Sequence, residues 1–374
     1  MPWTSSSLPH RLASASVTLT APSLEGINVA TWPGILTQLV EGEDLTVADT
    51  SWVMTEVLGG EAAPVNIAAF LAALRAKGET VAEVEGLVDA MLAHAERIEI
   101  PGRTVDVVGT GGDGAHTVNV STMAAIVIAA TGLTVVKHGN RAASSKSGSA
   151  DVLAELGVNL ELPPARVAEL ASEVGITFCF AQVFHPSFRF AAPIRKEMGI
   201  PTTFNILGPL TNPAQPAASA IGVANAKLAP VMAGVLAAKG RDAVVFRGHD
   251  GLDELAATAK ATVWEVRAGA VTESVLDPVA DLGVAAITVE DLRGGEASEN
   301  AAIATRVFAG ERGAVRDTVV LNAAAGLVAD GTLAGTGSGS LVERMRAAMS
   351  LCEGALDAGA ASEVLARWSA ASRQ

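Results

Sequence analysis

The sequence predicts an α/β protein in which a small helical domain is joined to a larger, mainly parallel α/β domain. Two observations predict this class. Residues 34–98 show helical patterns with capping signals and no strand-like run. From Pro101 onward, short β-branched runs alternate with helical segments, which is typical of parallel strands joined by crossover helices. The chain has 374 residues, 49% of them hydrophobic, which is enough for both domains.

The helical region divides at recognisable start and stop signals. Residues 46–49 read Thr-Val-Ala-Asp, which places a threonine at the N-cap and an acid at N3, and the glycine pair 59–60 ends that helix. A second amphipathic run covers residues 64–77 and begins with proline. Residues 80–83 form a further capping box, which predicts a helix to about Glu96.

The larger domain is expected to contain four parallel strands and one hairpin. The strands are Val105–Val108, Leu133–Val136, Ile176–Phe180 and Ala243–Phe246, and the hairpin joins Val263–Val266 to Ala270–Val275. The expected helices are a segment capped by Ser121 or Thr122 and ending at Ala130, then Asp151–Leu156, Ala165–Val174 and Lys227–Lys239, with mostly helix after Val289. Parallel sheets bind ligands at the carboxyl ends of their strands, so the loops there are the candidate sites.

Composition narrows the function before any motif is considered. The formal net charge is −14, which argues against a general nucleic-acid-binding protein. No apolar run approaches ~18 residues, so no membrane span is expected. The two cysteines, Cys179 and Cys352, have no metal or disulfide spacing, which suggests a reducing, cytoplasmic location. Residues 1–29 are rich in Ser, Thr, Ala and Pro and are expected to form a flexible N-terminal tail.

The segment GTGGDGAHTVNVST, residues 109–122, is the first candidate site, and we call it the glycine loop. It contains G-x-G-x-x-G, the fingerprint of dinucleotide-binding loops. That function also requires an acid about 20 residues later for the ribose, and none occurs between Asp113 and Asp151. Glycines let backbone N–H groups approach phosphates, and the loop is rich in hydroxyl and amide side chains. It therefore predicts a phosphate ligand other than a nicotinamide dinucleotide.

Three further segments complete the set of candidate loops. KHGNRAASSKSGSAD, residues 137–151, is the local cationic patch that an acidic protein needs to bind an anion, and we call it the basic loop. Residues 181–213 place Arg195 near several phenylalanines, which suits a planar carboxylate. GHDGLDELA, residues 248–256, offers hard oxygen ligands for Mg²⁺. Together the loops fit a Mg²⁺-bound phosphorylated sugar.

Five motifs together resemble the anthranilate phosphoribosyltransferase family. They are GTGGD (109–113), NVST (119–122), KHGNRAASSKSGSAD (137–151), FNILGPLTNP (204–213) and DGLDE (250–254), in the family's order over roughly residues 34–360. The resemblance implies transfer of phosphoribose from 5-phosphoribosyl 1-pyrophosphate (PRPP) to anthranilate in tryptophan biosynthesis. It also implies a nucleoside-phosphorylase-like phosphoribosyltransferase fold and a homodimer formed through the helical part.

In that family the helical domain is discontinuous. The resemblance therefore implies that residues 186–215 return to a helical domain formed by residues 30–100, with residues 101–185 and 216–374 forming the α/β catalytic domain. Many members carry Arg where Pro201 stands, and some carry Tyr where Phe188 stands, which concerns the shape of the acceptor channel and not the reaction class.

The resemblance places the donor site mostly in the glycine and basic loops. The residues expected to contact PRPP are Gly109, Gly112, Asp113, Thr117, Asn119, Val120, Ser121, Thr122, Lys137, His138, Gly139, Asn140, Arg141, Ala142, Ala143, Ser144, Ser145 and Ser149. The expected ligands of two Mg²⁺ ions are Ser121, Asp253 and Glu254. The expected anthranilate contacts are Gly109, Asn140, His185 and Arg195.

Three of these residues, Arg195, Asn140 and His138, are expected to act directly in catalysis. Arg195 would hold the carboxylate of anthranilate, and Asn140 would orient its amine. An aromatic amine is already neutral at pH 7, so positioning matters more than a strong base, and His138 as proton acceptor is the lesser alternative. Lys137 and Arg141, with Mg²⁺, would stabilise the departing pyrophosphate.

Two other functions stay open at this point. A pyrimidine nucleoside phosphorylase-like enzyme has a similar fold and would bind phosphate and a nucleoside, but the GTGGDG and DGLDE loops are not expected in it. A non-catalytic homologue that binds a phosphoribosyl ligand is the second alternative, and the intact loops argue against it. Neither nucleic acid nor a membrane is expected as a partner.

Overall fold

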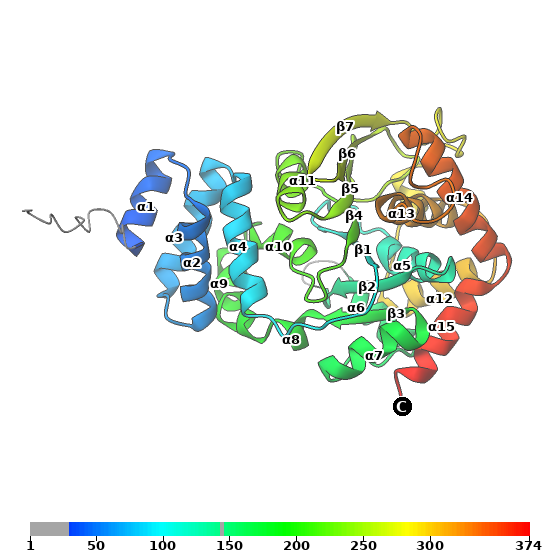
Figure 1. The fold of residues 1–374 in the computed structure, drawn as a ribbon, viewed down its shortest axis with the longest axis horizontal. Helices are drawn as coiled ribbons and strands as arrows, with labels where there is room; N and C mark the ends of the chain where they lie inside the picture. The colour runs from blue at the N-terminus through cyan, green and yellow to red at the C-terminus, as the bar shows by residue number, and fades with distance from the viewer. Residues whose placement is uncertain (1–29, 143–145) are drawn as a thin grey trace, which may run out of the picture.

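The computed structural model describes residues 30–142 and 146–374. The expected tail, residues 1–29, lies outside the described residues, as do three expected donor contacts, Ala143, Ser144 and Ser145. A helical bundle forms one end of the molecule and a sheet covered by helices forms the other, with α10 (Phe204–Leu210) between them (Figure 1). In the described part of the chain, no helix is both long enough and apolar enough to cross a membrane.

Four helices form the bundle, and their boundaries follow from the sequence. They are α1 (Trp32–Glu41), α2 (Val47–Gly59), α3 (Pro64–Lys77) and α4 (Val81–Ala93). Both predicted capping boxes form, because the hydroxyls of Thr46 and Thr80 each accept a hydrogen bond from the N–H three residues later. The helix expected to reach Glu96 ends three residues earlier, because the side chains of His94 and Arg97 hydrogen-bond to carbonyls of its last turns.

A second group of short helices lies far along the chain yet packs on the bundle. It consists of the 3-10 turn η1 (Pro186–Phe190), α9 (Ala192–Met198) and α10, and it follows the short helix α8 (Ala181–Phe184), which packs on β3. α9 packs against α3, α10 packs against α4, and Phe204 joins the apolar cluster of the bundle. On this basis we propose that residues 186–215 belong with the helical domain of residues 30–100, and that residues 101–185 and 216–374 form the α/β domain.

A single seven-stranded sheet is found within the described residues, in the order β3-β2-β1-β4-β5-β6-β7. Its strands are β1 (Thr104–Gly109), β2 (Thr134–Gly139), β3 (Ile176–Phe180), β4 (Ala218–Gly222), β5 (Asp242–Gly248), β6 (Ala261–Arg267) and β7 (Ala270–Leu276). β1 to β5 are parallel, and β6 and β7 add an antiparallel hairpin at one edge. The predicted class, a helical domain with a mainly parallel α/β domain, is confirmed.

The central strand β4 is absent from the sequence prediction. Its residues, Ala-Ser-Ala-Ile-Gly, have little strand preference apart from the isoleucine, so the pattern does not reveal it. The strand pairs with β1 and β5 and is buried along its whole length. Small residues are required because the chain packs tightly there: a Cβ on Gly222 would lie 1.6 Å from the Asp253 carbonyl oxygen. β4 therefore brings the loop after β5 close to the end of β1.

Helices cover both faces of the sheet. They are α5 (Val120–Ala130), α6 (Ser149–Glu155), α7 (Pro164–Val174), α11 (Leu228–Ala238), the 3-10 turn η2 (Val289–Leu292), α12 (Ala297–Phe308), α13 (Ala314–Asp330), α14 (Leu341–Asp357) and α15 (Ala360–Ala371). α5 and α13 are almost wholly buried against one face, with α14 and α15 outside them. α11 packs on the other face and also contacts α4, which joins the sheet to the bundle.

The start of α5 differs from the prediction. Ser121 or Thr122 was expected to cap this helix, but the N-cap is Asn119 and both residues lie in the first turn. No side chain hydrogen-bonds to the first N–H groups as a cap: the side chains of Asn119 and Ser121 have other partners, and the buried Thr122 hydroxyl has none among the described residues. The Asn119 amide bonds to Ser147 and Asn300, and the Ser121 hydroxyl accepts from Lys137. An α-helix that begins without a side-chain cap beside a glycine loop is suited to an anion.

Candidate active site at the carboxyl ends of the central strands

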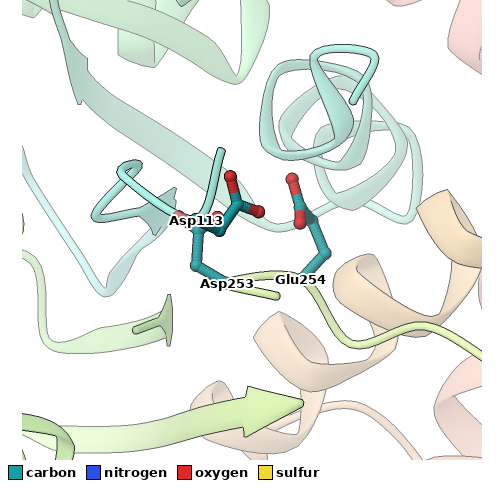
Figure 2. Close-up of side chains that lie close together, drawn as sticks. All are labelled: Asp113, Asp253 and Glu254. Atoms are coloured by element: carbon teal, nitrogen blue, oxygen red, sulfur yellow. The ribbon is translucent and has the colours of Figure 1, made fainter. Parts of the chain in front are cut away.

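Three carboxylates from two separate loops converge at the ends of β1 and β5. Asp113 belongs to the glycine loop, and Asp253 and Glu254 follow β5; one oxygen from each lies within 4.8 Å of the others (Figure 2). Asp113 Oδ2 and Glu254 Oε2 are buried and have no hydrogen-bond partner among the described residues. Buried like charges with unpaired oxygens are costly unless a cation joins them. The acidic cluster of Asp113, Asp253 and Glu254 therefore fits a hard cation such as Mg²⁺.

Hydrogen bonds from the glycine loop hold the cluster in place. The Gly111 N–H donates to Asp253 Oδ2 at 2.6 Å, and the Thr117 hydroxyl donates to Glu254 Oε1 at 2.7 Å. From the other side, Asn322 of α13 binds both backbone groups of Leu255, the residue after Glu254. The positions of Asp253 and Glu254 are thus set by hydrogen bonds from two sides of the loop that carries them.

Electrostatics in the cluster favour uptake of a proton or a cation. Burial raises the pKa of the Asp253 carboxyl to about 7, and the nearby charge of Asp113 adds to the effect. Burial also raises the pKa of Glu254 well above its usual range, with the charge of Asp253 as the next cause. A divalent cation would compete with these protons at neutral pH and would let both groups ionise.

The glycine loop owes its shape to backbone conformations that favour glycine. Gly111, Gly112 and Gly114 all have positive φ values of +66° to +89°. Further along, Gly294 donates to the His116 carbonyl and Leu292 accepts from the Val118 N–H, both at 2.9 Å. The loop therefore lies between the acidic cluster and the segment that leads into α12.

Lys137, an expected donor contact, lies inside the protein with only 1% of its surface exposed. Its ammonium donates to the Val107 carbonyl at 2.6 Å and to Ser121 Oγ at 3.1 Å. Burial lowers the pKa of Lys137 to about 8, and the negative charge of Asp106 counteracts part of that effect. The hydrogen bond to the Ser121 hydroxyl thus connects the buried Lys137 ammonium to the glycine loop.

Asp106 was not among the predicted site residues. It is fully buried in β1, accepts from the Asn212 amide at 2.9 Å, and has a pKa that burial raises to about 6. Asn212 also donates to the Val136 carbonyl, so this polar group joins the segment after α10 to β1 and β2 of the sheet. An acid within the apolar run 105–108 was the available signal, because a buried charge in a strand needs a partner.

His138 and His185 form a buried pair of neutral imidazoles, with ring centroids 5.1 Å apart. A ring nitrogen of each faces a backbone carbonyl: His138 Nδ1 lies 2.9 Å from the Gly208 oxygen, and His185 Nε2 lies 3.0 Å from the Thr211 oxygen. Burial, and then the other histidine, lowers the pKa of His138 to about 3, while burial lowers the pKa of His185 to about 4. His138 Nε2 is buried without a hydrogen-bond partner among the described residues.

Arg195 of α9 has an aromatic environment. Its guanidinium carbon lies 5.2 Å from the ring centroid of Phe188 and 5.1 Å from that of Phe204, and Nη2 donates to Asn205 Oδ1 at 3.3 Å. Burial without a neighbouring carboxylate lowers the pKa of Arg195. A guanidinium between two aromatic rings, without an acidic partner in the described chain, suits an aromatic carboxylate ligand.

In the basic loop, the expected contacts lie where β2 passes into α6. Arg141 is paired with Asp151 at 3.1 Å, and Asp151 also accepts from the N–H groups of Ala142 and Gly148. The Asn140 side chain accepts from the Arg141 N–H at 2.8 Å. Gly139 ends β2, Ser149 is the first residue of α6, and Val120 and Thr122 are buried in the first turn of α5.

The structure thus brings some of the predicted site residues together and leaves others apart. It unites the glycine loop with Asp253 and Glu254, and it adds Asp113 to the predicted metal group. It places Ser121 against Lys137. The residues that sequence reasoning missed are Asp106, Asn300 and Asn322. Asp106 had a weak signal as an acid within an apolar strand, whereas Asn300 and Asn322 had none, since a single Asn within a helix is not distinctive.

Comparison with known proteins places this chain in a family. The model of the glycosyl transferase family, α/β domain, matches residues 101–361, and that of its helical bundle domain matches residues 33–95. The anthranilate phosphoribosyltransferase of Streptomyces griseus is 58% identical, with 93% of this chain and 97% of that protein covered. That of Arthrobacter sp. is also 58% identical, over 92% and 96%.

Solved structures agree with these relatives. The anthranilate phosphoribosyltransferase of Thermus thermophilus superposes with a TM-score of 0.84 at 40% identity, covering 91% of this chain and 99% of that one. The Saccharomyces cerevisiae enzyme in complex with PRPP and Mg has a TM-score of 0.81 at 26% identity, covering 91% and 98%. Sequence, domain order and fold therefore agree along most of the chain, and the chain belongs to the anthranilate phosphoribosyltransferase family of glycosyl transferases.

Proposed function

We propose that this protein transfers phosphoribose from PRPP to the amine of anthranilate, with release of pyrophosphate, in tryptophan biosynthesis. The acidic cluster carries the proposal, because buried carboxylates with unpaired oxygens beside a glycine loop suit a metal-bound, phosphorylated donor. The sugar–oxygen bond to pyrophosphate breaks, a bond from the anomeric carbon to nitrogen forms, and the amine loses a proton. Such a displacement passes through an oxocarbenium-like state.

Asp253 and Glu254 would hold Mg²⁺, and the adjoining Asp113 supplies a third carboxylate. When bound, the ion would neutralise charge on the pyrophosphate. Ser121, expected as a further ligand, has a hydroxyl that accepts from Lys137, so it would approach the donor together with that ammonium. A second Mg²⁺ ion stays a prediction.

The acceptor would lie on the side of these loops that faces the bundle, near α9. Arg195 would bind the anthranilate carboxylate, and the aromatic rings of Phe188 and Phe204 would fix the guanidinium in place. Gly109 and Asn140 would orient the amine. The unprotonated Nε2 of His138 would accept a hydrogen bond from that amine. Positioning and charge stabilisation then supply most of the rate, since the amine needs little activation.

We also propose a cytoplasmic homodimer that associates through the helical domain. Two of the most exposed large apolar side chains, Val40 at 79% and Val65 at 72%, lie in that domain. Light scattering on the purified chain tests this part: a monomer at micromolar concentration would contradict it.

One assay tests the function. The protein is mixed with anthranilate, PRPP and Mg²⁺, and loss of anthranilate fluorescence is followed. The expected loss requires all three components and stops with EDTA. A parallel arm supplies phosphate and a pyrimidine nucleoside and measures the free base, which reports the phosphorylase alternative. Binding of PRPP without turnover in either arm would support the non-catalytic alternative.

A further inference from the structure

Asn300 of α12 joins three segments of the chain that surround the donor site. Its amide nitrogen donates to Asn119 Oδ1 at 2.8 Å and to Ser147 Oγ at 2.9 Å, and its oxygen accepts from the Gly295 N–H at 2.8 Å. Asn119 lies in the glycine loop directly before α5, and Ser147 lies in the basic loop two residues before α6. Only 3% of the Asn300 surface is exposed, so this side chain acts as a buried junction between the two loops.

The chemistry of this position is not what packing alone would select. The other inward residues of α12 are apolar, namely Ala301, Ala304, Val307 and Phe308. A buried amide is costly unless its donors and acceptor are satisfied, and here each is used. Buried polar groups that are fully satisfied can specify one arrangement of the chain. Asn300 therefore contributes geometry to the loops rather than apolar burial.

What Asn300 controls is the orientation of the Asn119 amide. Asn119 Oδ1 accepts from Asn300 and, at 3.2 Å, from the Ser147 hydroxyl, while its nitrogen donates to the Ser147 carbonyl at 3.3 Å. With two donors directed at its oxygen, the Asn119 amide has one favoured orientation. Without the Asn300 amide, this preference would be weakened and the two loops would lose a shared anchor.

Close backbone contacts connect the segment before α12 to the glycine loop, and through it to the acidic cluster. A Cβ on Gly294 would lie 2.8 Å from the Thr117 carbonyl oxygen and 3.0 Å from Asn300 Oδ1, so the segment before α12 lies directly against the glycine loop. Thr117 in turn donates to Glu254. Gly294 and Thr117 thus connect Asn300 to Glu254 of the proposed metal site.

We propose that Asn300 is a positioning residue that fixes the glycine loop relative to the basic loop and thereby sets the affinity for PRPP. This inference rests on the proposed function, because it concerns the donor of that reaction. Asn300 acts through Asn119 and Ser147 and does not itself touch substrate. It is therefore expected to affect donor binding far more than acceptor binding.

The decisive variant is Asn300→Asp, which keeps the size and the acceptor for Gly295 but removes both donors. One carboxylate oxygen would face Asn119 Oδ1, so the Asn119 amide is expected to turn away. The expected result is a rise of about tenfold in KM for PRPP and in its Kd by calorimetry, with KM for anthranilate changed less than twofold. Asn300→Ser, which retains one donor, is expected to fall between wild type and Asn300→Asp.

Two further variants separate positioning from general destabilisation. Val307→Ala removes apolar contacts from the same helix and deletes no polar group at the junction of the two loops, so it should lower the melting temperature and leave KM for PRPP unchanged. In an Asn119→Ala background, Asn300→Asp should add little to KM for PRPP, because its effect passes through Asn119.

The outcomes distinguish the inference from the proposed function. Folded Asn300→Asp with unchanged KM and Kd for PRPP would overturn it, as would equal rises in KM for PRPP and anthranilate. If Asn300→Asp does not fold, Asn300→Ser with wild-type PRPP affinity would overturn it. A wild-type protein without turnover would instead refute the proposed function.

Discussion

The carboxylate of Asp253 occupies the space directly beside the α-carbon of Gly109. A Cβ on Gly109 would lie 2.3 Å from Asp253 Oδ2, although Gly109 has an ordinary strand conformation without positive φ. The same oxygen accepts from the Gly111 N–H. The end of β1 therefore lies directly against the carboxylate of the proposed metal site, and glycine is required at position 109 for space.

Gly109→Ala should consequently damage the metal site without straining the backbone. The added methyl would displace the Asp253 carboxylate, and a shift of about 1 Å at a reacting centre can cost ~100-fold in rate. We expect a loss of kcat/KM of that order and a higher Mg²⁺ concentration for half-maximal activity. Gly354→Ala, in open space on α14, is the matched control and should remain fully active. Normal Mg²⁺ dependence in Gly109→Ala would contradict this account.

The acidic cluster itself can be tested by neutral, isosteric replacement. Asp253→Asn combined with Glu254→Gln removes two charges and should lower Mg²⁺-dependent turnover by at least ~100-fold, because the pyrophosphate loses its charge partner. Asp250→Asn is the control from the same loop: Asp250 is exposed and hydrogen-bonds only to Thr258 and Leu252 among the described residues. Initial rates across a Mg²⁺ series measure the effect. Near-normal turnover in the double variant would refute the metal assignment.

Acidity should weaken both Mg²⁺ binding and its effect on stability. Folding raises the pKa of Asp253 from its usual 3.8 to about 7, so the metal-free fold gains stability from the protonated carboxyl at low pH. That contribution is lost as pH rises between about 4 and 7. Above that range, bound Mg²⁺ would instead stabilise the fold by pairing with the ionised carboxylate. Mg²⁺ should therefore raise the melting temperature more at pH 8 than at pH 6, and its Kd should increase on acidification. A Kd independent of pH over that range would contradict the buried, protonatable cluster.

The fold was largely predictable because its signals are local. Capping boxes at Thr46 and Thr80 and the β-branched strands depend on neighbouring residues, and they appear where expected. β4 was missed because its small residues are selected by tight packing against the Asp253 loop, which is a contact distant in sequence. The start of α5 was misplaced for a similar reason, because the Ser121 hydroxyl bonds to Lys137 rather than to its own helix.

The site residues were predictable only where they belong to a recognisable sequence motif. Asp253 and Glu254 stand in a recognisable loop, whereas Asn300 and Asn322 are single amides within helices. Their importance arises from the segments they join in space, and no periodicity encodes that. Lys137 shows the opposite case: the sequence suggests a cation on a basic loop, and the fold buries it.

Arg195 should govern acceptor affinity and leave donor affinity nearly intact. Arg195→Ala removes a half-buried guanidinium that has no carboxylate partner in the described chain, so anthranilate would lose a charged hydrogen bond worth roughly 1.5–3 kcal/mol. KM for anthranilate should rise by about 10- to 100-fold. Arg189→Ala is the control, because Arg189 is exposed and stacks on Phe190 outside this aromatic site. Equal rises in both KM values would show that Arg195 does not bind the carboxylate.

His138 and His185 should remain neutral throughout the working pH range. Burial holds the pKa of His138 at about 3 and that of His185 at about 4, so neither ring should titrate above pH 5.5 in ¹⁵N NMR spectra. Facing the Gly208 carbonyl, His138 should carry its proton on Nδ1 and leave Nε2 free as an acceptor.

So weak a base can guide the amine but adds little to proton removal. We therefore expect His138→Asn to lower kcat less than tenfold and to leave the pH profile of kcat/KM unchanged, because strong general bases contribute 100-fold or more. A histidine titration near pH 6.5, or a 100-fold loss of kcat in a folded variant, would instead make His138 the proton acceptor of the reaction. His249→Asn, at a ring that bonds to Thr262 on the hairpin, is the control for replacing a histidine elsewhere in the sheet.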